Sequence, residues 1–427
     1  MLEFNTGKSR GGLRQDALFC RNARRIGSTF ILFLFFLLDK IPAGDGFIQL
    51  GEIHIESLVI TVFDLYIFVI FCLLIIVGKS LIIFKSIIVY SIFGLVFAGA
   101  VSMFVTNFTI NGFVELFQWL EMAVFVSLVA TLIQTESELK KSLRIFVYLG
   151  TVQAIWTIIH FILFGYPGRR FSGLIEGAAL IILLGLIAQN YDSLDRFQVP
   201  LLGVAVLLSQ ELKAFLALSG ASIILLFFLV LGSRIDNRKI LMTITSSLLL
   251  FIPLLAIIYL VWPAIVEPIL LQIQELLAIM RGSQSVIVTR KEIYTTGMNM
   301  FINNPIFGVG LENWHSVKDS YSTSTLQLIE NQKSVQYGPH SLLIKIIAET
   351  GMGGFFWFAI LVMYPFRIGC QELSNSNRGG LYLPIIGLIM YMVFFTALFS
   401  LQPISMYLFF YSLGLMLAYQ FRWQDLC

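Results

Sequence analysis

Residues 83–104 read IFKSIIVYSIFGLVFAGAVSMF, and their only charged side chain, Lys85, lies near the start. As an α-helix these 22 residues extend about 33 Å, enough to cross the hydrocarbon core of a bilayer. Their apolar side chains occur on every side of the helix, and such a surface is stable only when it is buried or faces lipid. The stretch therefore predicts a membrane-spanning helix.

Similar apolar runs occur along most of the chain. They predict an all-α, polytopic integral membrane protein with about twelve spans and a large, partly helical external loop. The expected spans are 28–44, 57–77, 83–104, 112–134, 142–164, 174–190, 197–211, 214–232, 240–262, 340–366, 381–399 and 402–420.

The composition supports lipid as the solvent for most of the chain. Hydrophobic residues make up 58% of the 427 residues and charged residues 12%, against about a quarter charged in soluble domains. The four cysteines have no paired spacing and the four histidines form no HExxH pattern. We therefore expect no disulfide framework, no metal and no cofactor, and no nucleic acid as a partner.

The distribution of Lys and Arg predicts the orientation, because cytoplasmic loops are enriched in these residues. It places both termini in the cytoplasm. The expected division is a basic cytoplasmic tail at 1–27, spans one to nine within 28–262, a periplasmic loop at 263–339, spans ten to twelve within 340–420 and a second cytoplasmic tail at 421–427. Three residues on the outer side, Arg169, Arg170 and Lys213, do not follow this rule. They either extend to lipid headgroups or bind an anion.

The long loop contains two expected helices. Residues 266–280 have apolar side chains at helical spacing, which is typical of an amphipathic helix on the membrane surface. Residues 289–303 predict a second helix, with Thr289 as its cap and Glu292 three residues later. We expect residues 312–338, which are polar, to be irregular.

Residues 337–354 (YGPHSLLIKIIAETGMGG) join this loop to the tenth expected span. Pro339 suits the first turn of a helix, which places His340 at the outer mouth of the span. Lys345 and Glu349 have the i,i+4 spacing of an ion pair within a helix. His340 is either a proton-transferring group or an ordinary histidine at the membrane interface.

Three short motifs resemble those of a known family: residues 304–310 (NPIFGVG), 339–342 (PHSL) and 348–354 (AETGMGG). They resemble the NPLFGxG, HNxxL and AExGxxG elements of the O-antigen ligase/polymerase superfamily. Arg290 matches an arginine that the family has upstream of the first element, and residues 170–173 (RFSG) resemble its Arg-x-x-Gly element. The number of spans and the position of the long loop also agree with this family.

The chain departs from the family pattern at three places. Ser341 stands where the family usually has Asn after the histidine, and Glu176-Gly177-Ala178 replaces an Asn-Pro-Asn element. Lys213 stands where an arginine is common, and a lysine cannot bind a phosphate through two parallel hydrogen bonds.

The resemblance implies a GT-C-like fold in a bacterial inner membrane. It also implies transfer of a glycan from an undecaprenyl-pyrophosphate-linked oligosaccharide to an acceptor hydroxyl on the outer, periplasmic side. It implies His340 as general base and Arg290, Arg169 or Arg170, and Lys213 as groups that bind the pyrophosphate. The pyrophosphate is a good leaving group, so no metal is expected. Glu349, Lys345, Glu115 and Glu121 are expected to support the site. The two carboxylates of span four are more often partners of buried cations than bases.

Three functions stay open from the sequence. The first is a surface polysaccharide polymerase, whose acceptor is a second lipid-linked glycan. The second is a ligase that transfers the polymer to lipid A-core. Either enzyme would work with other assembly proteins, such as a flippase and a chain-length regulator. The third is a transporter or flippase, although no pairing of two similar halves with broken helices is visible in the sequence.

Overall fold

The computed structural model describes residues 41–43, 46–48, 52–55, 58–61, 86–106, 108–133, 135–164, 172–188, 197–209, 211–231, 286–333, 337–374, 381–399 and 403–424. The expected tail 1–27, the expected span 240–262 and the expected loop helix 266–280 lie outside these residues, as do most of the expected spans 28–44 and 57–77.

The described chain is mainly α-helical, and two short antiparallel hairpins precede the helices. The strands are β1 (Ile41–Ala43), β2 (Gly46–Ile48), β3 (Glu52–Ile55) and β4 (Leu58–Thr61). The helices are α3 (Ile87–Val105), α4 (Ile110–Leu132), α5 (Glu136–Phe164), α6 (Ser172–Ala188), α7 (Gln198–Leu208), α8 (Leu212–Leu231), α11 (Val286–Asn303), α12 (Trp314–Tyr321), α13 (Ser324–Lys333), α14 (Leu342–Ser374), α15 (Tyr382–Met392), the π-helix η3 (Val393–Phe399) and α16 (Pro403–Gln424).

Two local expectations are corrected here. Strand β4 covers the first residues of the expected span 57–77 and pairs Glu52 with Thr61, so this stretch begins as a strand. Its β-branched residues Val59, Ile60 and Thr61 favour the extended backbone. Residues 312–338 are not mostly irregular, because α12 and α13 lie within them.

The membrane fold is confirmed by helix length and composition. Five helical segments of the described residues are long and apolar enough to span a bilayer: Ile87–Val105, Ile110–Leu132, Glu136–Phe164, Lys213–Val230 and Leu342–Glu372. Three shorter apolar helices accompany them: Ser172–Ala188, Gln198–Leu208 and Tyr382–Thr396. The number twelve stays a prediction.

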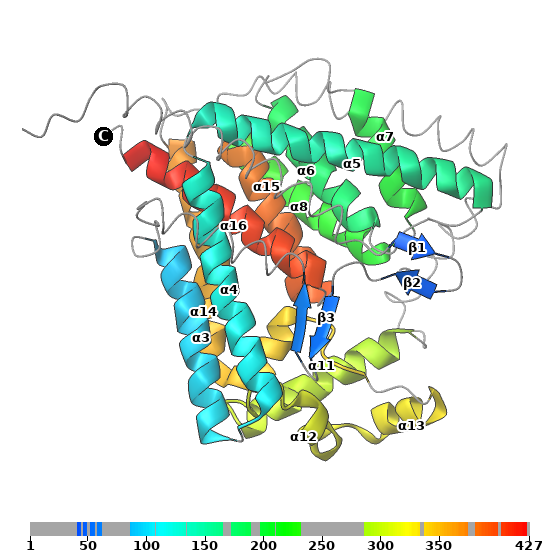
Figure 1. Ribbon diagram of the computed structural model, residues 1–427, viewed down its shortest axis with the longest axis vertical. Coiled ribbons are helices and arrows are strands. Elements are labelled where there is room, and N and C mark those ends of the chain that lie inside the picture. Colours follow the sequence, from blue (N-terminus) through cyan, green and yellow to red (C-terminus); the bar gives the residue numbers. More distant parts are fainter. Residues whose placement is uncertain are drawn as a thin grey trace, which may run out of the picture.

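The long helices form two packed groups that share α15 and α16 (Figure 1). Helix α14 packs along α3, and α16 packs along α4. Helices α5, α6, α7 and α8 pack on one another, and α6 and α8 also contact α15. Helices α11, α12 and α13 gather at one end of α14, where they form a small apolar core of their own around Ile293, Met300, Trp314 and Leu326.

Hydroxyl groups inside the long helices bond to backbone carbonyls one turn earlier. Ser91 Oγ donates to the Ile87 carbonyl at 2.7 Å and Ser127 Oγ to the Ala123 carbonyl at 2.9 Å. These polar groups therefore need no water, which the interior of a bilayer does not supply. Helices α3 and α4 begin at side-chain caps, Ser86 and Thr109, whose oxygens accept from the backbone N–H of Ile88 and Gly112.

Helix α14 is broken at Gly351, which has φ +63° and ψ −154°. The backbone N–H of Met352 therefore does not bond within the helix, and it donates to the Pro305 carbonyl at 2.8 Å. The N–H groups of Val309 and Gly310 donate to the carbonyls of Ala348 and Glu349 at 2.9 and 3.0 Å. The stretch 305–310 thus supplies the bonds that the break removes.

Glycine is required at two places in this contact. Gly308 has φ +68°, and a Cβ atom there would lie 2.4 Å from the backbone carbon of Glu349. A Cβ atom at Gly351 would lie 2.5 Å from the Ile306 carbonyl oxygen. The glycines of the two motifs therefore let the loop and the broken helix approach each other.

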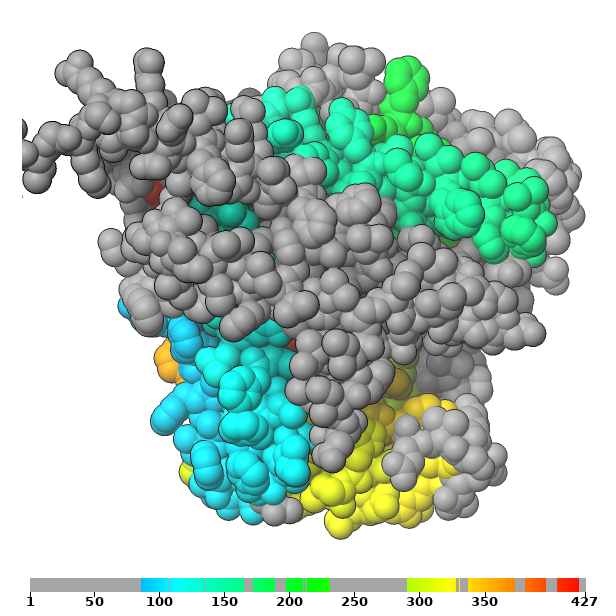
Figure 2. All heavy atoms as spheres, viewed as in Figure 1, coloured from blue at the N-terminus to red at the C-terminus, as the bar shows by residue number. Residues whose placement is uncertain are grey.

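A series of exposed aromatic rings marks the ends of α3 and α4 nearest to this contact. Phe104, Phe108, Phe113 and Phe117 are exposed, and their ring centroids follow one another at 6.1, 6.3 and 4.9 Å. In Figure 2 the face of α3 and α4 lies beside residues of α11–α13 at the same end of the molecule. Exposed apolar rings on a membrane helix are stable in contact with lipid.

Candidate functional site

His340 lies just outside α14, on the side where α11, α12 and α13 gather. Ser341 caps the helix, because its Oγ accepts from the backbone N–H of Ile344 at 3.3 Å. Helix α14 begins at Leu342, so Pro339 precedes the first turn instead of lying in it. The imidazole remains exposed and its ring contacts the ring of Tyr337, with 6.2 Å between centroids. His340 therefore lies at the mouth of the helix, as the sequence predicts.

Two cations from distant parts of the chain act on this imidazole. His340 is exposed at its surface, but the protein withdraws part of the imidazole from solvent. This partial loss of solvent lowers the pKa of His340 from its ordinary value, and the positive charges of Arg290 and Lys213 lower it further. Arg290 comes from α11, where its charge also acts on the hydroxyl of Tyr294, one turn later. Arg290 and Lys213 are therefore near enough to His340 for their charges to act on its imidazole.

Lys213 is held in place by an aromatic side chain. It lies in the first turn of α8, and its Nζ atom is 5.1 Å from the ring centroid of Phe395 in η3. The turn before α8 packs tightly on the start of α6, where a Cβ atom at Gly173 would lie 2.4 Å from Ser209 Oγ. Arg169 and Arg170, the other expected phosphate ligands, lie outside the described residues.

Below His340, three carboxylates surround one lysine. Lys345 Nζ is 2.7 Å from Glu115 Oε2 and also contacts Glu312 Oε1. Glu349 Oε2 accepts the backbone N–H of Glu312 at 3.1 Å. We refer to Lys345, Glu115, Glu312 and Glu349 as the carboxylate cluster. Lys345 thus finds its partners on α4 and in the loop after Gly310, which corrects the expected pairing with Glu349 within one helix.

Two of the three carboxylates in the cluster are buried. Glu115 and Glu349 are 8% and 1% exposed. The carboxylate oxygens of Glu115 and Glu312 lie within 4.8 Å of each other, and both contact the ammonium group of Lys345. Burial alone would raise the pKa of Glu312, but its hydrogen bond to Glu115 and the charge of Lys345 hold this pKa well below the ordinary value. The cluster therefore places three carboxylates around the ammonium group of Lys345, beside the candidate site.

The second carboxylate of α4 does not take part in this arrangement. Glu121 is half-buried, and the salt bridge of Lys345 goes to Glu115. The carboxylate oxygens of Glu115, Glu312 and Glu349 lie within 4.8 Å of one another. Among the described residues, this is the group of acidic side chains whose spacing could hold a metal ion. The ammonium group of Lys345 already lies between two of these carboxylates.

Sequence reasoning missed Glu312 and two further residues, Lys318 and Glu330. Glu312 has φ +57° and follows the turn at Gly308 and Gly310, so the glycine motif was the signal that its surroundings are unusual. Lys318 and Glu330 form a buried ion pair at 2.7 Å between α12 and α13. The sequence analysis treated both helices as irregular, so no facing positions could be inferred.

Thr289 and Glu292 do not form the expected cap. Helix α11 begins at Val286, which places Thr289 inside the helix. The Glu292 carboxylate accepts instead from the Thr323 hydroxyl at 2.5 Å, and Thr323 caps α13 through the backbone N–H of Leu326. Glu292 therefore links α11 to the residue that caps α13.

Comparison with known proteins agrees with the expected family. Residues 197–359 match the family model described as O-antigen ligase. This range includes Lys213, Arg290, His340 and Glu349, and Glu115 lies outside it. No curated protein matches the chain. The matched region and the membrane-spanning helices therefore make the chain similar to the O-antigen ligase/polymerase superfamily.

Proposed function

We propose that the protein is a surface polysaccharide polymerase that transfers a glycan from an undecaprenyl-pyrophosphate carrier to a sugar hydroxyl. The reaction takes place at the periplasmic face of a bacterial inner membrane. The observation that carries the proposal is the position of His340 at the mouth of α14, where the charges of Arg290 and Lys213 act on its imidazole. A proton acceptor beside two cations is the arrangement that glycosyl transfer from a pyrophosphate needs.

In the proposed reaction, the acceptor hydroxyl oxygen attacks the anomeric carbon of the donor. The bond from this carbon to the pyrophosphate oxygen breaks, and the hydroxyl proton goes to the neutral imidazole of His340. Arg290 and Lys213, together with Arg169 or Arg170, balance the charge on the leaving pyrophosphate. The leaving group needs no further activation, so the proposed reaction uses no metal.

The two cations also link donor binding to the strength of the base. Without donor, the positive charges and the loss of solvent lower the pKa of His340 and keep its imidazole neutral. A bound pyrophosphate offsets these charges and makes the imidazole a stronger base once the leaving group is in place. The base is therefore strongest when the donor is present.

The pH dependence of the reaction tests this arrangement. Activity is expected to fall as the pH drops through the pKa of His340, which lies below about 6.5 in the enzyme without donor. Arg290→Gln removes one positive charge, so the acid limb of the kcat/KM profile should move to higher pH. Lys141→Met, an exposed substitution on α5, is the matched control. A midpoint that stays unchanged in Arg290→Gln would contradict the assignment.

Polysaccharide gels of a deletion strain separate the two enzymes of this type. Loss of a polymerase leaves a single repeat unit on lipid A-core, because a ligase still transfers it. Loss of a ligase leaves lipid-linked polymer and a bare core. A strain with unchanged surface polysaccharide would rule out both activities.

A further inference from the structure

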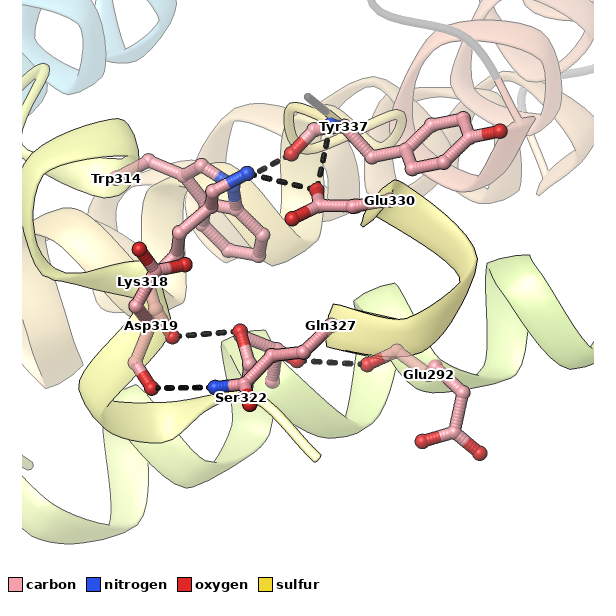
Figure 3. Close-up of polar contacts among 9 residues, drawn as sticks. Glu292, Trp314, Lys318, Asp319, Ser322, Gln327, Glu330 and Tyr337 are labelled. Atoms are coloured by element: carbon pink, nitrogen blue, oxygen red, sulfur yellow. Dashed lines mark hydrogen bonds and ion pairs between the residues drawn. The ribbon is translucent and has the colours of Figure 1, made fainter. Parts of the chain in front are cut away.

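The mechanism above makes no use of a buried ion pair in the loop region. Lys318 of α12 is 1% exposed, and its Nζ atom lies 2.7 Å from Oε1 of Glu330, which belongs to α13 and is 9% exposed (Figure 3). A charge so deeply buried is stable only with a partner, so the pair fixes α12 and α13 in one relative position.

The same carboxylate oxygen reaches a third segment. Glu330 Oε1 also accepts the backbone N–H of Tyr337 at 2.7 Å. The indole N–H of Trp314 donates to the carbonyl of Tyr337 at 3.3 Å. Both backbone polar groups of Tyr337, a residue outside any helix, are therefore held by side chains of α12 and α13 (Figure 3).

Tyr337 lies three residues before His340, and only Gly338 and Pro339 separate the two. Their rings are in contact at 6.2 Å between centroids with an interplanar angle of 72°. On the other side of His340, Ser341 caps α14. His340 thus lies in a short segment, residues 338–341, that is fixed at one end by α14 and at the other by Tyr337.

We propose that Lys318 and Glu330 are positioning residues that hold Tyr337 and, through it, keep His340 facing Arg290 and Lys213. The proposal rests on the proposed function, in which His340 is the base. Neither Lys318 nor Glu330 contacts the reacting groups. Loss of the hydrogen bond to Tyr337 leaves the segment 338–341 fixed only at α14, so His340 can move. A displacement of the base by about 1 Å costs on the order of 100-fold in rate.

A matched pair of double variants in the full-length protein tests this role. Lys318→Met with Glu330→Gln removes both charges but keeps an amide oxygen that accepts the N–H of Tyr337. Lys318→Met with Glu330→Leu removes the charges and the acceptor at similar side-chain volume. Neither variant leaves a buried charge without a partner, so the two differ only in the acceptor for the N–H of Tyr337.

We expect the leucine variant to lose about 10- to 100-fold in kcat, with the KM for donor within about 2-fold of wild type. The glutamine variant should stay within about 3-fold in kcat. Equal losses in both variants would show that the pair acts only on stability. Wild-type kcat in the leucine variant would likewise overturn the proposal.

A second readout does not depend on glycosyl transfer. Diethyl pyrocarbonate modifies neutral histidine, and its rate at His340, followed by peptide mass spectrometry across pH, gives the midpoint of titration. In the leucine variant His340 moves away from Arg290 and Lys213, so its midpoint should rise while that of the glutamine variant stays at the wild-type value. The same midpoint in all three proteins would overturn the proposal.

This readout also separates the proposal from the proposed function. The wild-type protein could lack transferase activity while the His340 midpoint still rises in the leucine variant. That result would refute the proposed function and leave the positioning role in place. Where the leucine variant does not fold, Trp314→Phe carries the test, because it removes the indole donor to Tyr337 and keeps a ring in the core. Its His340 midpoint should rise in the same direction, and an unchanged midpoint would overturn the proposal.

Discussion

Replacement of His340 by glutamine is expected to reduce polymer formation by about 10²- to 10⁴-fold, the usual contribution of a general base. Glutamine keeps a polar side chain of similar size but cannot accept the proton of the acceptor hydroxyl. Arg290 and Lys213 remain in place, so the binding of the lipid-linked donor should change little. The measurement is initial rate of transfer with purified protein, beside donor binding at equilibrium.

His160→Gln supplies the control for this variant. His160 lies near the end of α5 between the rings of Trp156 and Phe164, and it plays no part in the proposed site. It should retain wild-type activity. Full activity in His340→Gln would remove the catalytic account and favour a transport or structural role for the chain.

Replacement of Lys345 by methionine is expected to have the largest effect on stability. The carboxylates of Glu115, Glu312 and Glu349 lie within 4.8 Å of one another, and Lys345 is the cation that contacts two of them. Removal of one partner of a buried ion pair costs about 3–5 kcal/mol, because the remaining charges stay buried. A lower thermal unfolding midpoint in detergent, or a loss of folded protein, should show this.

Two further variants make the Lys345 prediction specific. Lys345→Met combined with Glu115→Gln removes one negative charge as well and should be more stable than Lys345→Met alone. Lys141→Met, at an exposed position of α5, should stay within about 0.5 kcal/mol of wild type. The electrostatic explanation is wrong if the double variant is no more stable than Lys345→Met.

Hydropathy was sufficient for the long helices, because a bilayer imposes one length and one composition on any span. The expected segments 83–104, 112–134 and 142–164 correspond to α3, α4 and α5, although α5 begins earlier, at Glu136. The end of α11 at Asn303 was also predictable. Pro305 disfavours the helical backbone in the residue before it, Asn304, so the helix ends there.

The partners of buried charges were not predictable from spacing. The i,i+4 rule paired Lys345 with Glu349, yet the partner in the structure, Glu115, lies 230 residues away in the chain. The break at Gly351 brings Glu312 to the same place, and nothing local in the sequence gives this contact. Short helices such as α12 and α13 were missed because eight or ten polar residues give a weak apolar pattern.

The site residues came from two different kinds of signal. The glycine motifs at 304–310 and 348–354 have a physical basis in the close approach of Gly308 to the broken helix. The grouping of His340, Arg290 and Lys213 followed from family resemblance, since these residues lie far apart in the chain. In the structure the charges of Arg290 and Lys213 lower the pKa of His340, and the roles of the three residues stay a prediction.

Under the proposed function, the approach of the lipid-linked donor depends on the exposed rings of Phe104, Phe108, Phe113 and Phe117. They lie at the end of α3 and α4 where Gly112 approaches the backbone of Leu311, next to Glu312. Aromatic rings in contact with the acyl chains fix the depth of the protein in the bilayer. A polyprenyl tail sets the depth of its own pyrophosphate in the same way. The proposed site and the donor pyrophosphate would therefore lie at the same depth in the membrane. The donor would then reach the site by lateral diffusion within the bilayer.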